Sequence, residues 1–371
     1  MTQQPERSSW MEDAIAYCLA RVRENLIRLD AFPDYTQGDK WITVADGGSV
    51  GGYWVGLLWL AYVHTKDAAL EAAARAWAAR LTPRSTDSTT HELGSLFELS
   101  HVLGARITGD ASLREPALQA AATLARRVNQ RGGYLQASGD PDASGELRGR
   151  SVIEAMASLG LLYWAGQETG NSQYVRSATQ HARTARTYQV RTNFSTAQVA
   201  DFDPDMGAFR KQDTCDGLNA ASCWSRGQAI ALYGFAAAYG WSRDPSFRET
   251  ARGLAEYTLL MSPDRVPYWD YNSPAIPRDV RDSSAAAISA SGLLNLAALE
   301  TDDRASLATR WRSHATRTLQ TLWLNYSSQG ASEPSILLHG TASKPRGNTD
   351  TGLIYGDYYF VEGLTRLMGM W

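Results

Sequence analysis

The sequence predicts an all-α fold, an (α/α)6 barrel or six-hairpin toroid, as a single domain over residues 1–371. Two classes of helix-forming segment alternate along the chain, one apolar nearly all round and one amphipathic. Long loop-like segments lead into the apolar class, and short turns follow it. Six inner and six outer helices in alternation make such a barrel, because all-round apolar helices belong inside and amphipathic ones can face water.

The outer helices are expected where charges gather on one face of the periodic pattern. These segments are 9–30, 67–82, 112–128, 172–188, 245–261 and 304–325. All but the first follow a short turn: HTKD at 64–67, TGDAS at 108–112, TGNSQ at 169–173, SRDPS at 242–246 and TDDRA at 301–305. Asp, Asn and Ser in these turns are suitable N-caps for the next helix.

The inner helices are expected in the segments that are apolar all round and rich in Gly and Ala. They are 51–63, 92–105, 151–166, 226–240, 283–299 and 353–368. The segments that precede them read as irregular loops: 31–50, 83–91, 129–150, 189–225, 262–282 and 326–352. Parallel inner helices place all six loops and helix N-termini at one mouth, where binding sites usually lie and where an anionic group is favoured.

Composition narrows the function classes. The net charge is −3 with Lys and Arg spread along the chain, so no nucleic-acid partner is expected. The polar start argues against a signal peptide and no apolar run approaches the length of a membrane span, so we expect a cytoplasmic protein without a membrane partner. The cysteines, Cys18, Cys215 and Cys223, lack metal-ligand spacing and suggest a reducing compartment without disulfides. We expect no metal and no cofactor, because HExxH, Cys/His-cluster and glycine-rich nucleotide motifs are missing from the sequence.

Two acids stand where inner helices begin: Glu92 in THELGS and Glu154 in RGRSVIEAM. Either one alone is better explained by a capping box or by the helix dipole. On successive inner helices, however, they form a pair, and paired carboxylates are the usual apparatus of glycoside hydrolysis. A carboxyl group in an aromatic-lined mouth also has its pKa raised by desolvation, as a general acid requires.

Arg226 begins the fourth inner helix, with Ser222 as its expected cap. The guanidinium can pair with Asp282 or Asp216, or it can hold a substrate carboxylate bidentately, and the sequence leaves these alternatives open. Asp350 and Asp357 flank the last inner helix in NTDTGLIYGDYY, where capping and core hydrogen bonding are the favoured roles. Twelve Trp and seventeen Tyr are many for this length, and although most should fill the core, some can line a sugar site.

Several segments together resemble glycoside hydrolase family 88, the unsaturated glucuronyl hydrolases. GGYWVGLLWL, THELG, IEAMASLGLLYWAG, DFDPDMG, SCWSRGQAIALYGFA, VPYWDY, RDSSAAAISASGLLNLA and LIYGDYYFVEGLTRL fall in the order seen in that family, from about residue 9 to 369. The resemblance implies the (α/α)6 barrel and an acidic oligosaccharide substrate. It also implies release of a terminal 4,5-unsaturated uronic acid by hydration of the C4=C5 bond, with no metal or organic cofactor. We expect a monomer or a homodimer.

The resemblance also implies roles for residues. Glu154 occupies the position of the family's acid/base, and Glu92 that of its second essential carboxylate. The candidate substrate-binding residues are His91, Arg226, Gln198, Asp216, Trp224 and Trp54.

The sequence departs from the family pattern, which has Asp at both acid positions. Gln198 replaces a usual His and Asp216 a usual Gln, and aromatics are missing near Ser49, Ser95, Ser138 and Ile230. An exchange of both acids for the homologous acid favours a working enzyme with a different or larger substrate. The alternatives are an inverting glycosidase on a saturated sugar, a uronate lyase, and a non-catalytic sugar-binding barrel.

Overall fold

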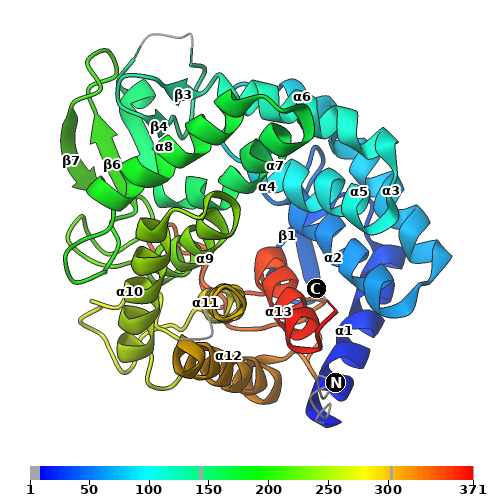
Figure 1. The fold of residues 1–371 in the computed structure, drawn as a ribbon. Helices are drawn as coiled ribbons and strands as arrows, with labels where there is room; N and C mark the ends of the chain where they lie inside the picture. Colours follow the sequence, from blue (N-terminus) through cyan, green and yellow to red (C-terminus); the bar gives the residue numbers. More distant parts are fainter. Residues whose placement is uncertain (1–8, 142–144, 301–303, 371) are drawn as a thin grey trace.

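A computed structural model of the chain describes residues 9–141, 145–300 and 304–370. Its helices form two concentric rings, as Figure 1 shows most plainly for the inner α9, α11 and α13 and the outer α10 and α12. The inner ring consists of α2 (Gly51–Thr65), α4 (Leu93–Phe97) continued by η2 (Glu98–Val102) and α5 (Leu103–Thr108), η5 (Ile153–Ser158) continued by α7 (Leu159–Thr169), α9 (Ser225–Ser242), α11 (Ser283–Ala298) and α13 (Ile354–Leu367). The outer ring consists of α1 (Ser9–Arg28), α3 (Ala68–Leu81), η3 (Ala111–Leu113) with α6 (Arg114–Ala125), α8 (Ser172–Tyr188), α10 (Pro245–Met261) and α12 (Ala305–Tyr326). The predicted (α/α)6 barrel is confirmed.

Four of the predicted turns cap the outer helix that follows them. Asp67, Asp110, Asn171 and Asp244 each accept a hydrogen bond from the backbone N–H two residues later. This satisfies one of the N–H groups that a helix start leaves without a partner. The first three residues of the fifth turn, TDDRA, lie outside the described residues.

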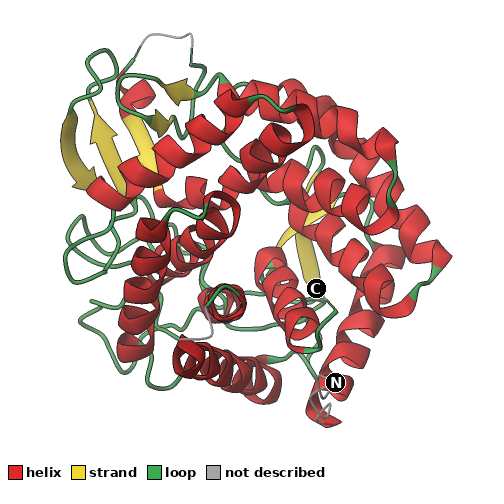
Figure 2. Cartoon of the chain, viewed as in Figure 1, coloured by secondary structure: helices red, strands yellow, loops and turns green. Residues whose placement is uncertain are grey.

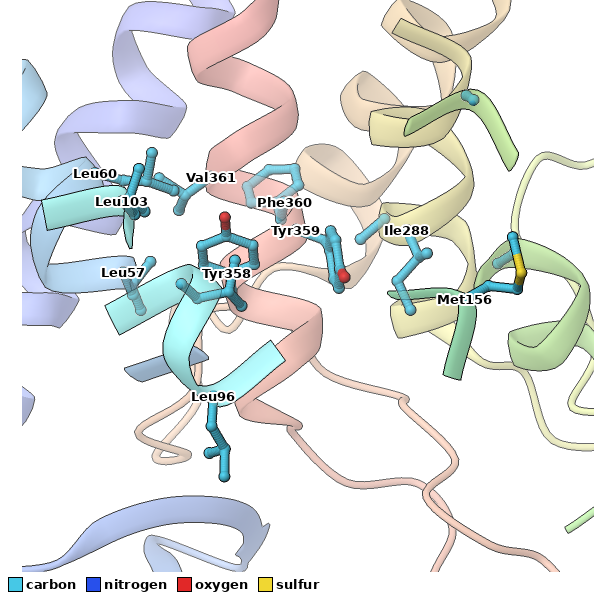
Figure 3. Packing of buried hydrophobic residues seen from close by; sticks show 14 of the residues in the cluster. Leu57, Leu60, Leu96, Leu103, Met156, Ile288, Tyr358, Tyr359, Phe360 and Val361 are labelled. Atoms are coloured by element: carbon cyan, nitrogen blue, oxygen red, sulfur yellow. The ribbon is translucent and has the colours of Figure 1, made fainter. Parts of the chain in front are cut away.

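The core runs between the two rings and along the barrel axis. One cluster of buried apolar side chains extends from Ala14 in α1 to Leu367 in α13. Figure 3 shows part of this packing, in which Tyr358 and Tyr359 of α13 lie between the leucines of α2 and Ile288 of α11. Because every face of the inner helices is covered, their sequences are apolar all round.

Two inner helices differ from the prediction of continuous α-helix. The second changes to a π-helical turn over η2, and the third begins with a strand, β5 (Arg150–Val152), and the 3-10 helix η5 before α7 starts. Ser151 and Val152 are extended because β5 pairs with a neighbouring strand, through Ser151 opposite Ala200 and Val152 opposite Val199. Glu154 therefore lies in a 3-10 helix, whereas Glu92 immediately precedes the regular α-helix α4.

The loops at the mouth contain short antiparallel strands, which the all-α prediction missed. Figure 2 shows the strands in yellow, some at the edge of the helical rings beside α8 and others between α2 and α13 in this view. They are β1 (Phe32–Gln37) with β2 (Lys40–Val44), β3 (Val128–Asn129) with β4 (Tyr134–Leu135), and β5 with β6 (Val199–Phe202) and β7 (Phe209–Asp213). The three-stranded sheet matters for the site, because Gln198 directly precedes β6 and Asp216 follows β7.

Two further expectations from composition concern the membrane and the cysteines. Within the described ranges, no helix is both long enough and apolar enough to span a membrane. Cys18, Cys215 and Cys223 are all free thiols, with Cys18 and Cys223 buried and Cys215 exposed.

Candidate active site

A cavity of about 260 Å³ opens at the mouth where the inner helices begin. Its helical lining residues come from the first two turns of those helices, and its other walls come from the loops. The lining residues are Asp34, Ser49, Val50, Tyr53, His91, Glu92, Ser95, Glu154, Ala157, Ser158, Asp216, Trp224, Arg226, Ile230, Ile288, Ala342, Arg346, Tyr355 and Tyr359. The structure thus brings Glu92 and Glu154 into one pocket at the barrel's opening, as their positions on successive inner segments predicted.

Glu154 has two carboxyl oxygens in different surroundings. Its Oε1 accepts a hydrogen bond of 2.7 Å from Nε2 of Gln198. Its Oε2 is buried and has no hydrogen-bond partner among the described residues. Burial raises the pKa of Glu154 to about 7; the hydrogen bond from Gln198 opposes this rise, and the charge of Asp216 adds to it. The group can therefore hold a proton near neutral pH.

Glu92 stands one residue before α4, and its carboxylate Oε2 accepts a hydrogen bond of 3.1 Å from Oγ1 of Thr90. The backbone N–H of Glu92 donates to the same hydroxyl. Neither α4 nor η5 has a side-chain cap, so the capping-box alternative is wrong for Glu92 and for Glu154. Within the described residues, neither carboxylate forms an ion pair with Lys or Arg.

His91 is buried beside Glu92, and its Nδ1 lies 2.7 Å from the carbonyl oxygen of Ala137. Burial lowers the pKa of His91. Because a carbonyl only accepts, Nδ1 carries the hydrogen, and the neutral ring keeps Nε2 as a bare acceptor. His91 can thus accept a hydrogen bond from a sugar hydroxyl.

Arg226 is held in place by protein groups. Its guanidinium pairs with Asp282 at 3.2 Å and donates to the carbonyl oxygens of Thr341 and Ala342. The rings of Trp224 and Tyr355 lie 4.5 Å and 5.1 Å from it. Of the alternatives for Arg226, the structure shows the pair with Asp282. The positive charge still lines the cavity.

Two other expectations about polar residues have opposite outcomes. Ser222 does not cap α9, because its hydroxyl donates to Asp270 at 2.7 Å and Trp224 occupies the N-cap position without a side-chain cap. Asp357 is buried in the core and accepts hydrogen bonds from the N–H groups of Ile336 and Leu337. The predicted core hydrogen bonding is confirmed for Asp357, whereas Asp350 does not cap α13 and instead contacts Nδ1 of His339.

The remaining candidates divide into three groups. Trp224 and Asp216 line the cavity, whereas Gln198 does not line it and instead bonds to both Glu154 and Asp216. Trp54 is fully buried and packs edge-on against Trp77 of α3, with ring centroids 5.9 Å apart. Its selection as a substrate-binding residue is therefore corrected. Trp54 follows Tyr53, and each step along a helix turns the side chain by about 100°, so that Trp54 points toward the outer ring.

The residue that faces the cavity from α2 is Tyr53, which was not among the residues predicted from the sequence. Its ring meets Tyr355 and Tyr359 of α13, at centroid distances of 6.0 Å and 5.8 Å. The i, i+4 spacing of Tyr355 and Tyr359 was a usable signal, since such residues share one helix face. Asp34 in β1 and Arg346 in the last loop were also missed, and no local pattern marks them.

Comparison with known proteins places this site in a family. No family model matches the chain. The chain is, however, 34% identical over 364 residues to an unsaturated glucuronyl hydrolase of Bacillus sp. (strain GL1), and the match covers 96% of each chain. The chain belongs to the unsaturated glucuronyl hydrolases. It is also 30% identical over 367 residues to an unsaturated chondroitin disaccharide hydrolase of Streptococcus pyogenes serotype M1, covering 96% of this chain and 91% of the relative.

Solved structures of the family agree over the full length of the barrel. The crystal structure of the unsaturated glucuronyl hydrolase from Bacillus sp. GL1 superposes with a TM-score of 0.90 at 32% identity, covering 96% of both chains. The resemblance to the unsaturated glucuronyl hydrolases found in the sequence is thus confirmed. The chain is a carbohydrate-active hydrolase of the unsaturated glucuronyl hydrolase type.

Proposed function

We propose that this hydrolase releases a terminal unsaturated uronic acid from an acidic oligosaccharide, with Glu154 as general acid/base and Glu92 assisting. The observation that carries the assignment of roles is that both carboxyl groups line one cavity at the mouth. Burial also raises the pKa of Glu154 to about 7. The relatives' names support the substrate class, since they describe hydrolases of unsaturated glucuronyl and unsaturated chondroitin saccharides.

The proposed chemistry is a hydration. Glu154 transfers its proton to C4 of the C4=C5 bond, which leaves positive charge shared between C5 and the ring oxygen. Water adds at C5 and returns a proton to Glu154, so that the acid is regenerated. The hemiketal so formed then opens and expels the leaving sugar. Glu92, from the neighbouring inner segment, supplies the second carboxyl group near the developing charge.

The charges around the cavity fit a uronic acid. Arg226 provides a fixed cation in the wall, and Arg346, whose side chain is 70% exposed, provides a second at the rim. The N-termini of the inner helices add positive potential at the same mouth. A carboxylate entering the cavity would meet these groups, and His91 can accept a hydroxyl hydrogen.

The direct test is incubation with unsaturated disaccharides made by polysaccharide lyases. We expect the ultraviolet absorbance of the vinyl ether to fall as the double bond is hydrated, and product NMR to show the released sugar. Absorbance that stays constant across glucuronyl disaccharides of several linkages would overturn the proposal. An anomeric inversion of a saturated substrate, or a newly formed double bond, would instead identify the glycosidase or lyase alternative.

Activity should depend on pH through the proton on Glu154. A general acid must be protonated, and burial raises the pKa of this carboxyl group to about 7. We therefore expect kcat/KM to hold below about pH 7 and to fall about tenfold per pH unit above it. A profile measured with an unsaturated disaccharide checks this. Activity that rises through pH 7 to 9 would show that Glu154 acts in another protonation state.

A further inference from the structure

The side-chain amide of Gln198 is fixed in one orientation. The residue is 4% exposed, and its backbone carbonyl accepts from the N–H of Ile153 at 2.8 Å. Its Oε1 accepts three hydrogen bonds: from Oγ1 of Thr214 at 2.8 Å, from N of Cys215 at 2.7 Å and from N of Asp216 at 2.9 Å. Backbone N–H groups only donate, so the oxygen must lie at this end of the amide, and a flipped amide is excluded.

The amide NH2 group therefore faces two carboxyl groups. Nε2 of Gln198 donates to Oε1 of Glu154 at 2.7 Å and to Oδ2 of Asp216 at 2.9 Å. Both of its hydrogens are used, and its oxygen already accepts three bonds. No donor or acceptor of the amide is left for a substrate, so the selection of Gln198 as a substrate-binding residue does not fit the contacts it makes.

We propose that Gln198 is a positioning residue, an amide clamp that ties Oε1 of Glu154 to Asp216 and leaves Oε2 as the atom that carries the catalytic proton. This inference rests on the proposed function, in which Glu154 is the acid. Oε2 of Glu154 is the buried oxygen without a partner among the described residues, as the clamp requires.

Asp216 is the other half of the clamp. Its Oδ1 lies 3.6 Å from the guanidinium of Arg346, whereas Glu154 has no such ion pair in the described part of the chain. The charge of Asp216 therefore favours the protonated form of Glu154, the carboxyl group without a cation. Two other ionisable groups interact electrostatically with Glu154. They are Arg226, whose charge favours the carboxylate form of Glu154, and Cys215.

Gln198 and Asp216, the two halves of the clamp, have opposite effects on the pKa of Glu154. The N–H of Gln198 favours the ionised form of Glu154, so its loss should raise the pKa of that carboxyl group. The charge of Asp216 disfavours the ionised form, so its loss should lower the same pKa. A hydrogen bond to a charged group is strong enough to move a pKa by about one unit. A merely structural role would not produce two shifts of opposite sign.

The test compares Gln198→Met with Asp216→Asn in the full chain. We expect the alkaline limb of kcat/KM to move up by about one pH unit in the first variant and down in the second. Gln329→Met, at an exposed glutamine, is the matched control and should leave the limb unchanged. Gln198→Glu keeps the acceptor oxygen and replaces only the NH2 group, so it can take the place of Gln198→Met if that variant does not fold. The alkaline limb of kcat/KM should again move up.

A second readout separates this inference from the proposed function. Carbon-13 NMR of glutamate carboxyl groups, with Glu154 assigned through Glu154→Gln, reports its pKa without any substrate. Shifts of opposite sign support the clamp even if the wild-type protein leaves unsaturated disaccharides intact, which would overturn only the function. An unmoved Glu154 pKa with a raised KM in Gln198→Met would make Gln198 a substrate ligand and overturn the clamp.

Discussion

Replacing Glu154 with Gln should lower kcat by roughly a thousandfold on an unsaturated disaccharide, with KM little changed. Gln keeps the size of the side chain and can still accept the bond from Gln198 at the position of Oε1. It carries no acidic proton, so C4 of the substrate cannot be protonated. Steady-state kinetics by loss of vinyl-ether absorbance measures this directly.

A matched control exists within the same barrel. Glu98 lies on the π-helical turn of a neighbouring inner segment, and burial raises its pKa to about 7 as well. It lines a separate cavity with Glu362 and Arg366 near the other ends of the inner helices. Glu98→Gln should therefore leave kcat unchanged within error. Comparable losses in both variants would mean that burial of a glutamate, and not its place at the mouth, explains the effect.

Replacing Gly94 with Ala should both destabilise the protein and reduce its activity. A Cβ atom at Gly94 would lie 2.2 Å from Cβ, 2.3 Å from Cα and 2.4 Å from the carbonyl oxygen of Ser158. Backbone atoms cannot rotate away, so α4 and η5 must separate, at a cost of about 3 kcal/mol in unfolding free energy. Glu92 immediately precedes α4 and Glu154 lies in η5, and a shift of about 1 Å between the two elements can cost about a hundredfold in kcat.

Urea denaturation and kinetics on the folded variant measure the two effects separately. Gly240→Ala in α9 is the control, because a Cβ there meets only Leu299 side-chain atoms at 3.5 Å and 3.8 Å. Alanine is favoured over glycine inside a helix by about 1 kcal/mol, so this variant should be as stable as the wild type or slightly more stable. Equal behaviour of the two alanine variants would contradict the close contact between α4 and η5.

The sequence predicted the barrel well because its signals are local and repeated. The caps at Asp67, Asp110, Asn171 and Asp244 are read from a few neighbouring residues, and all-round apolar helices identify the inner ring. The strands in the mouth loops were missed because they are only two to six residues long and depend on pairing between distant segments, as between β5 and β6.

The site was predicted in part, for a similar reason. Glu92 and Glu154 stand at helix starts, and a parallel inner ring brings helix starts together. Which face of α2 points inward depends on helix rotation, so Trp54 was chosen although Tyr53 is the residue that lines the cavity. The hydrogen bonds of the clamp join Gln198, before β6, to Asp216, after β7, and to Glu154 in η5. These residues are far apart in the chain, and no spacing in the sequence indicates that they meet.

The most direct test of hydration at this site is NMR of the product formed by the wild-type protein in heavy water. If Glu154 delivers a solvent-exchanged proton to C4, the released uronic acid must carry one deuterium on C4, and this signal must vanish with turnover in Glu154→Gln. Release of the terminal sugar with C4 unlabelled and the double bond intact would contradict the account, since cleavage would then have bypassed the C4=C5 bond.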